Sequence, residues 1–288
     1  FAVGSDKIRL GLSPSGTKVG GIFILFSRSP GLEGDILLED LARAPGDPKR
    51  LNGVLLMGEG DGQNIARVFD GAGDFNGDGV DDVIVGSERG SFGKGEAIVI
   101  FGSRTLLSPE GGFTLDEIVA AGRAVRFIGT AEGDLAGANV AGAGDVDFDG
   151  RGDILIAAPN ANPLNNPAGA PGAVYLIYGA EQYQSGGVID LSLVGTPEVP
   201  GIVFVGRTAG DFMGGGEVTL QVNPRDLRSG EFEPTTAFSR GLAALGDIDG
   251  DGRADYAISS ILADPNGKTN AGEIYVIYGK GDRPPLAP

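Results

Sequence analysis

Three short acidic stretches contain the residues of this sequence whose types and spacing could do chemistry. They begin at Asp74, Asp145 and Asp247, and each has oxygen-bearing side chains at positions 1, 3, 5 and 9 and a glycine at position 6. The glycine lets the backbone turn sharply enough to surround a cation. Hard oxygen ligands, without imidazole or thiolate, suit Ca²⁺. We therefore expect about three bound Ca²⁺ ions, one in each nine-residue loop.

The predicted metal ligands are the four polar side chains of each loop together with the backbone carbonyl of its seventh residue. A single acidic, glycine-rich turn would more simply be a solvated surface loop, but three copies in one register favour a metal site. No catalytic residue and no organic cofactor are predicted. The ligands are Asp74, Asn76, Asp78, Val80 and Asp82 in the first loop, Asp145, Asp147, Asp149, Arg151 and Asp153 in the second, and Asp247, Asp249, Asp251, Arg253 and Asp255 in the third.

The residues after each loop decide which kind of calcium motif this is. An EF-hand loop has an acidic ligand at position 12 and runs into an amphipathic helix. Position 12 is here Val85, Ile156 or Ile258, within short apolar runs rich in β-branched residues. Such runs are typical of buried strands. The loops are therefore expected to join two β-strands.

Two further apolar runs recur after each loop, so the sequence is built from a repeated unit. We name its strands A, before the loop, B, after the loop, C and D. Four strands per repeat are typical of a β-propeller blade. The aromatic residues of strand C lie inside apolar runs, so we expect them to pack between blades rather than to stack on sugars. Strand C is expected at residues 20–27, 95–102, 172–179 and 272–279, and strand D at residues 54–58, 125–129 and 202–206.

These units resemble the FG-GAP repeats of integrin α-subunit propellers and of many bacterial surface proteins. The resemblance rests on the Gly-Asp pair that opens each loop, as in Gly73-Asp74, on the loop itself, on the apolar strand B, and on Ala157-Ala158-Pro159 after the second loop. It implies an all-β fold, a β-propeller built of four-stranded blades with calcium loops between strands A and B. The repeat units fall at about residues 1–58, 59–129, 130–206 and 207–281, followed by a proline-rich tail at 282–288.

The strand count predicts an incomplete propeller. Strands B and C occur four times and strands A and D three times, which makes fourteen strands or about three and a half blades. The chain is therefore expected to be a partial propeller or part of a seven-bladed assembly. An insertion at residues 215–238 is expected to add a strand over residues 218–222, and short helices are expected over residues 114–121 and 35–42.

Composition excludes several classes of function. The formal net charge is −17, which disfavours nucleic acid and anionic membranes as partners. The chain has no cysteine and no histidine, so disulfides, zinc sites and imidazole catalysis are excluded. Calcium loops of this type fill where calcium is abundant, which predicts an extracellular or cell-surface location, with the periplasm as an alternative. No membrane-inserted segment is predicted.

The expected function is a calcium-binding, non-enzymatic module for structure, adhesion or protein–protein interaction, with a protein partner or self-association. Its binding surface is expected on the face opposite the calcium loops, at residues 215–238, 160–171 and 261–271. The tripeptide Arg151-Gly152-Asp153 spells a sequence that integrins bind, but a metal ligand at Asp153 argues against an adhesive role. Two alternatives stay open. One is a glycan-binding, lectin-like propeller that uses residues 160–171 and 264–271, and the other is a hydrolase with a calcium-supported site.

Overall fold

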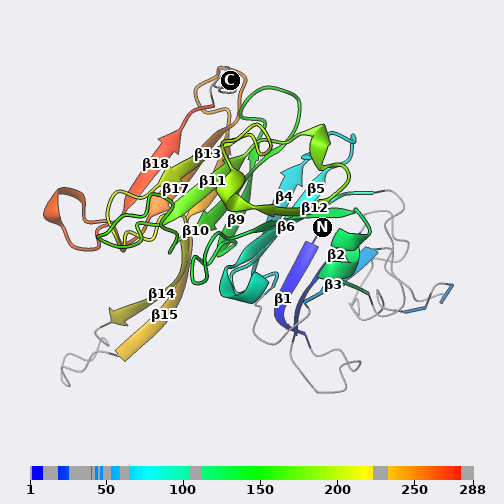
Figure 1. Cartoon of the computed structure of the whole chain (residues 1–288), viewed down its shortest axis with the longest axis horizontal. Coiled ribbons are helices and arrows are strands. Elements are labelled where there is room, and N and C mark those ends of the chain that lie inside the picture. Colours follow the sequence, from blue (N-terminus) through cyan, green and yellow to red (C-terminus); the bar gives the residue numbers. More distant parts are fainter. Residues whose placement is uncertain are drawn as a thin grey trace.

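The computed structural model describes residues 2–8, 19–25, 40, 43–44, 46–47, 53–58, 65–103, 112–222 and 233–279. Its described part is an all-β fold of four sheets and one separate hairpin, with a single short α-helix (Figure 1). The expected all-β class is therefore confirmed. The predicted tail at residues 282–288 lies outside the described residues, as does the expected helix at residues 35–42 apart from Asp40.

Each sheet is formed mainly by one repeat unit, and its repeat strands pair in antiparallel order. All fourteen strands expected from the sequence are present. Sheet I contains β1 (Ala2–Ile8), β2 (Val19–Leu25) and β3 (Gly53–Met57); sheet II contains β4 (Val68–Gly73), β5 (Asp82–Ser87), β6 (Glu96–Ile100) and β8 (Ala124–Ile128); sheet III contains β9 (Asn139–Gly144), β10 (Asp153–Ala158), β11 (Ala173–Ile177) and β13 (Gly201–Val205); and sheet IV contains β16 (Leu242–Gly246), β17 (Asp255–Ser260) and β18 (Glu273–Ile277).

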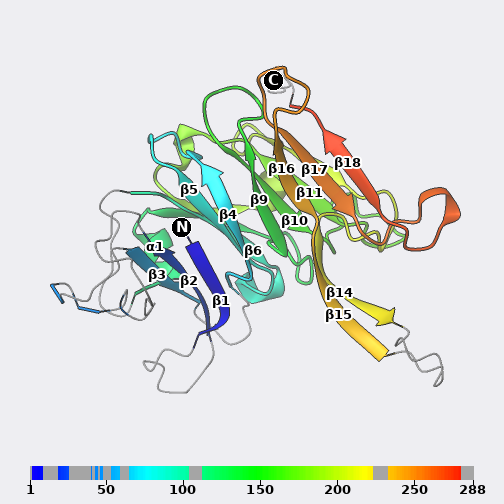
Figure 2. The ribbon, with the colours of Figure 1, turned by 180° about the vertical axis from the view of Figure 1, so that it is seen from behind.

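The four sheets follow one another in chain order as an open fan, with sheets I and IV at its two ends (Figure 2). Sheets II and III have strands A, B, C and D in spatial order. Sheet I has strands B, C and D, and sheet IV has strands A, B and C. This arrangement is consistent with propeller blades. The described residues do not close into a ring.

Two short parallel strands, which the sequence analysis did not predict, join neighbouring sheets. Strand β7 (Phe113–Thr114) pairs with β3, and β12 (Gly187–Asp190) pairs with β8. Each belongs to the C-to-D connection of the following sheet. The connection that contains β7 continues into α1 (Leu115–Ala120), where the Thr114 side chain accepts a hydrogen bond from the Glu117 amide. The helix predicted at residues 114–121 is thus confirmed. Single 3₁₀ turns lie at Ser91–Gly93, Glu181–Tyr183, Leu191–Leu193 and Pro265–Gly267.

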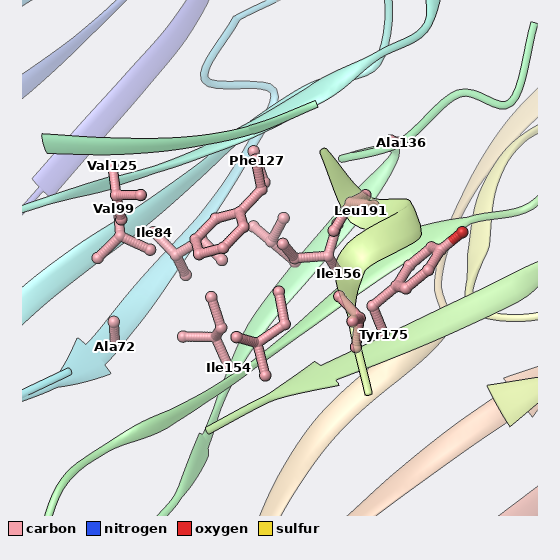
Figure 3. Packing of buried hydrophobic residues seen from close by; sticks show 14 of the residues in the cluster. Ala72, Ile84, Val99, Val125, Phe127, Ala136, Ile154, Ile156, Tyr175 and Leu191 are labelled. Carbon is pink, nitrogen blue, oxygen red and sulfur yellow. The ribbon is translucent and has the colours of Figure 1, made fainter. Parts of the chain in front are cut away.

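The core consists of three apolar clusters, each between two neighbouring sheets. Between sheets II and III, Ile84, Val99 and Phe127 face Ile154 and residues around it (Figure 3). Of the aromatic residues of strand C, Phe101 and Tyr175 are buried in this cluster and Tyr178 in the cluster between sheets III and IV, as expected for packing between sheets, whereas Tyr278 is exposed. In the same region the rings of Phe75 and Tyr183 stack with centroids 4.8 Å apart, and Phe127 meets both edge-on.

The insertion before the last strand A forms a two-stranded hairpin of β14 (Gly215–Val222) and β15 (Glu233–Arg240). It projects from the fan at the end away from the acidic loops (Figure 1). The sequence predicted only the first of the two strands. At the hairpin base the Asn139 amide donates to the Gly214 carbonyl over 3.2 Å, and the Arg67 guanidinium lies 4.8 Å from the centre of the Phe238 ring.

Candidate metal sites

The three acidic loops occupy equivalent places, between strands A and B of sheets II, III and IV. At the base of each loop the ladder shifts register at the pair formed by the glycine before the loop and the ninth loop residue, such as Gly73 with Asp82. The preceding glycines have left-handed φ values of 63°, 78° and 69° at Gly73, Gly144 and Gly246. A residue with a side chain would be strained in this conformation. The Gly-Asp pair therefore sets the turn into the loop.

The first aspartate of each loop organises the backbone that follows it. In the first loop, one Asp74 oxygen accepts from the Asp78 amide at 2.9 Å and the other from the Gly79 amide at 2.8 Å. Asp145 and Asp247 accept the equivalent pairs of hydrogen bonds in the second and third loops. The fifth residue then accepts from the amide of the seventh, again in all three loops. The loops therefore share one hydrogen-bond frame.

This frame gathers carboxylates in two of the loops. Ligand-type oxygens of Asp145, Asp147 and Asp149 all lie within 4.8 Å of one another, and so do those of Asp247, Asp249 and Asp255. Ca²⁺ holds its oxygen ligands at about 2.3–2.6 Å, so two ligands of one ion are at most about 5 Å apart. The spacing and the all-oxygen donor set therefore fit Ca²⁺. In the first loop Asn76 stands at position 3, and its amide donates to Asp78 over 3.2 Å.

The ninth residue of each loop has a structural role that the sequence did not reveal. Both carboxylate oxygens of Asp153, which is 0% exposed, accept backbone hydrogen bonds, one from Val146 inside the loop at 2.8 Å and one from Gly179 at 2.9 Å. Gly179 follows strand C, so the carboxylate ties the loop to the end of the strand that neighbours strand B. Asp82 and Asp255 make the equivalent bonds in their loops.

Burial shifts the pKa of the carboxyl group at the ninth loop position. It raises the pKa of Asp153 to about 8 and that of Asp82 to about 7, while backbone hydrogen bonds such as that from Gly179 oppose the shift. A cation at the loop would act in the same direction as those bonds by favouring the charged form. The inward position of the Asp153 carboxylate also removes it from the surface on which an integrin would read Arg151-Gly152-Asp153.

In two loops the seventh residue is an arginine, and its side chain adds a positive charge to the loop. The Arg151 side chain donates to Asp149 at 2.9 Å and to Glu181 at 2.8 Å, and Arg253 donates to Asp251 at 3.3 Å. Each guanidinium thus neutralises part of the negative charge at position 5. The role predicted for the backbone carbonyls of Val80, Arg151 and Arg253 stays a prediction.

The described residues contain two more buried aspartates whose carboxylates accept backbone hydrogen bonds. Asp134 accepts from the Ala131 amide at 2.8 Å and Asp211 from the Thr208 amide at 3.0 Å, each within the turn that follows strand D. In the sequence each of these aspartates directly follows a glycine, Gly133 or Gly210. Their carboxylates satisfy backbone donors of the turn and belong to its framework.

Comparison with known families matches the part of the chain that contains the first two loops. The model of the FG-GAP repeat family matches residues 70–100 and 136–177, which span strands A, B and C of sheets II and III. A search of curated proteins found no match. Domains of this family are typically extracellular, and within the described residues no helix is long and apolar enough to cross a membrane. The chain therefore carries FG-GAP repeats, which suggest a β-propeller module of the kind used in adhesion and protein binding.

Proposed function

We propose that the chain is a calcium-binding, non-enzymatic β-propeller module of a secreted or cell-surface protein and that it serves adhesion or protein–protein interaction. The observation that carries this proposal is the repetition of one hydrogen-bond frame in three acidic loops, two of which gather three carboxylates each. Carboxylates held this close repel one another until a cation binds between them. Calcium would then stabilise the turn between strands A and B in each loop-bearing sheet. It would thereby hold the conformation of the loops on that face of the module.

A calorimetric titration of the chelator-stripped chain tests the metal role. We expect about three Ca²⁺ per chain and weaker binding of Mg²⁺, which demands a stricter octahedral geometry. A ligand present at a hundred times its dissociation constant stabilises the folded state by about 2.7 kcal/mol per site, so calcium should also raise the melting temperature. Identical melting curves in calcium and in excess chelator would exclude the proposal.

Single substitutions assign the sites. Each of Asp74→Asn, Asp145→Asn and Asp247→Asn should lower the stoichiometry by about one ion. The matched control is Asp81→Asn, which makes the same charge change at an exposed acid of the first loop that is not a predicted ligand. A reduced number of bound Ca²⁺ ions in this control would show that calcium binding depends on general negative charge and not on the loop geometry.

We also propose that the module acts without catalysis, because its acidic clusters repeat in equivalent turns whereas an active centre would be expected once. A glycan array and a panel of hydrolase substrates test the two alternatives, a lectin and a hydrolase. The proposed partner is a protein, and the proposed binding surface is the face with the β14–β15 hairpin, opposite the loops. The number of blades in the complete assembly stays a prediction.

A further inference from the structure

The three acidic loops are joined to one another by backbone hydrogen bonds. Strands A of sheets II, III and IV, which lead into the loops, lie side by side (Figure 2). The Gly152 amide, at the eighth position of the second loop, donates to the Asp74 carbonyl at 3.1 Å. The Ala254 amide, at the eighth position of the third loop, donates to the Asp145 carbonyl at 3.2 Å. The residue whose carboxylate organises one loop is therefore held by the backbone of the following loop.

A side-chain contact repeats the same connection. The arginine at the seventh position of a loop lies against the fourth residue of the preceding loop. The Arg253 guanidinium is 5.4 Å from the centre of the Phe148 ring, and a β-carbon on Gly77 would be 2.7 Å from the Arg151 Nε atom. The Nε atoms of both arginines are buried and have no hydrogen-bond acceptor among the described residues. Each arginine is thus packed between two loops.

Phe148 is an unusual residue for its place in the second loop. The fourth position has a left-handed backbone in all three loops, with φ values of 73° at Gly77, 60° at Phe148 and 82° at Gly250. Glycine adopts this conformation freely, whereas a residue with a side chain is strained in it. Phe148 is also 64% exposed, so burial of its ring offsets little of the strain. What the phenylalanine adds is the contact with Arg253 of the third loop.

The first and second loops share a third connection, through the segment that follows strand C of sheet III. Gly179 and Ala180 are adjacent there. The Gly179 amide donates to Asp153, the ninth residue of the second loop, and the Ala180 amide donates to the carbonyl of Phe75, the second residue of the first loop, each at 2.9 Å. One short segment therefore bonds to both loops, so the order of one loop affects the other.

We propose that neighbouring loops bind Ca²⁺ with positive cooperativity, and that the contacts between successive loops, including that of Phe148 with Arg253, transmit it. Once a loop is filled, its seventh to ninth residues are fixed, and through these contacts they hold the preceding loop. The next ion then enters a loop that is already partly ordered, so less conformational entropy is lost on binding. Repulsion between two bound ions acts in the opposite direction, so a positive sign identifies the structural route.

The inference rests on the proposed calcium-binding role, and an NMR titration with Ca²⁺ tests it at each site. The amides of Gly79, Gly150 and Gly252 donate to the first aspartate of their own loops, so each signal reports one site. In the Asp145→Asn chain, the first and third loops should bind Ca²⁺ about five- to tenfold more weakly than in the wild type. Unchanged or tighter binding at these two loops would overturn the proposal.

Electrostatics alone predicts the opposite result for this variant. The substitution removes one negative charge from the second loop, whereas a bound Ca²⁺ adds two positive charges to it. The empty variant loop is therefore more negative than the filled wild-type loop and would attract ions to its neighbours. Asp74→Asn should weaken the second loop more than the third, because the contacts described above link the first loop only to the second. Equal weakening of both loops would overturn the proposal.

The decisive variant is Phe148→Gly, which keeps every predicted ligand and introduces the residue that the other two loops have at this position. The coupling is the ratio of the third loop's dissociation constants with the second loop disabled by Asp145→Asn and with it intact. Phe148→Gly should lower this ratio about two- to fivefold, the strength of an exposed cation–π contact. The coupling between the first and second loops should stay unchanged.

Phe92→Gly is the matched control. Phe92 also has a left-handed backbone, with φ of 59°, and its side chain is 101% exposed, but it lies outside the acidic loops. The same substitution there should leave the coupling at its wild-type value. An unchanged ratio in the Phe148→Gly chain, or an equal decrease in the Phe92→Gly chain, would overturn the proposal.

Calorimetry separates failure of this inference from failure of the proposed function. Three ions that bind independently of one another would refute the cooperativity and leave the calcium-binding role intact. A chain that binds no Ca²⁺ at any loop would refute both.

Discussion

Substitution of Asp153 should reveal that the ninth loop residue stabilises the fold even without metal. Asp153→Ala removes the acceptor of two backbone donors, the amides of Val146 and Gly179, at a place that is 0% exposed. Each buried donor left without a partner costs about 1–3 kcal/mol, so the free energy of unfolding should fall by about 4 kcal/mol. For a domain of this size about 1 kcal/mol corresponds to roughly 2–4 °C, which predicts a drop in melting temperature of about 10 °C.

Asp149→Ala is the informative comparison, because it removes a carboxylate from the same loop. Asp149 is exposed, and water can replace it as acceptor for the Arg151 amide. In excess chelator we therefore expect a loss below about 1 kcal/mol, in the range of ordinary surface substitutions. In calcium both variants should additionally lose the stabilisation that the metal gives to this loop.

The assay is thermal unfolding of both variants and the wild type, each in excess chelator and in saturating calcium. Asp153→Asn serves as a graded control, because the amide oxygen can still accept one of the two hydrogen bonds and about half of the loss should remain. Equal melting temperatures of the Asp149→Ala and Asp153→Ala chains in chelator would refute the structural role of the ninth residue. A calcium response as large as that of the wild type in both variants would refute the metal role of this loop.

Two further predictions concern the hairpin and the core. Replacing residues 215–238 by a short glycine–serine turn should leave folding and calcium binding intact but abolish partner binding or self-association at that face; association that survives the deletion would place the surface elsewhere. Phe75→Ala should lower the free energy of unfolding in urea by about 3–5 kcal/mol, because Phe75 is fully buried and stacks on Tyr183. Phe92→Ala, at a side chain that is 101% exposed, is the control and should stay within about 0.5 kcal/mol of wild type.

Repetition explains why so much of the fold could be predicted. Strand β11 lies in an uninterrupted apolar run bounded by glycine, and similar runs recur along the chain. The loop positions were likewise set by identical spacing, which fixes the frame of hydrogen bonds around Asp74 and its counterparts. Local patterns were enough wherever the structure is determined by residues close in sequence.

Features that depend on distant pairing could not be predicted in this way. Strands β7 and β12 are short, and they exist because each lies beside strand D of the preceding sheet. Strand β15 contains Pro234, which argues against a strand in the sequence, yet it is accommodated in an isolated hairpin where both strands are edges. The second acceptor role of Asp153 depends on Gly179, which the fold and not the local sequence brings to it.

The glycine that ends strand C depends both on the local sequence pattern and on distant pairing. It contacts the acidic loop although it lies outside the loop in the sequence. Its amide donates to the ninth loop residue in all three loop-bearing sheets. A β-carbon on Gly102, Gly179 or Gly279 would lie 2.1, 2.4 or 2.6 Å from the carbonyl oxygen of the eighth loop residue, so the loop packs directly on that glycine. The loop therefore requires a glycine at this place, so a residue outside the loop also indicates that the loop is present.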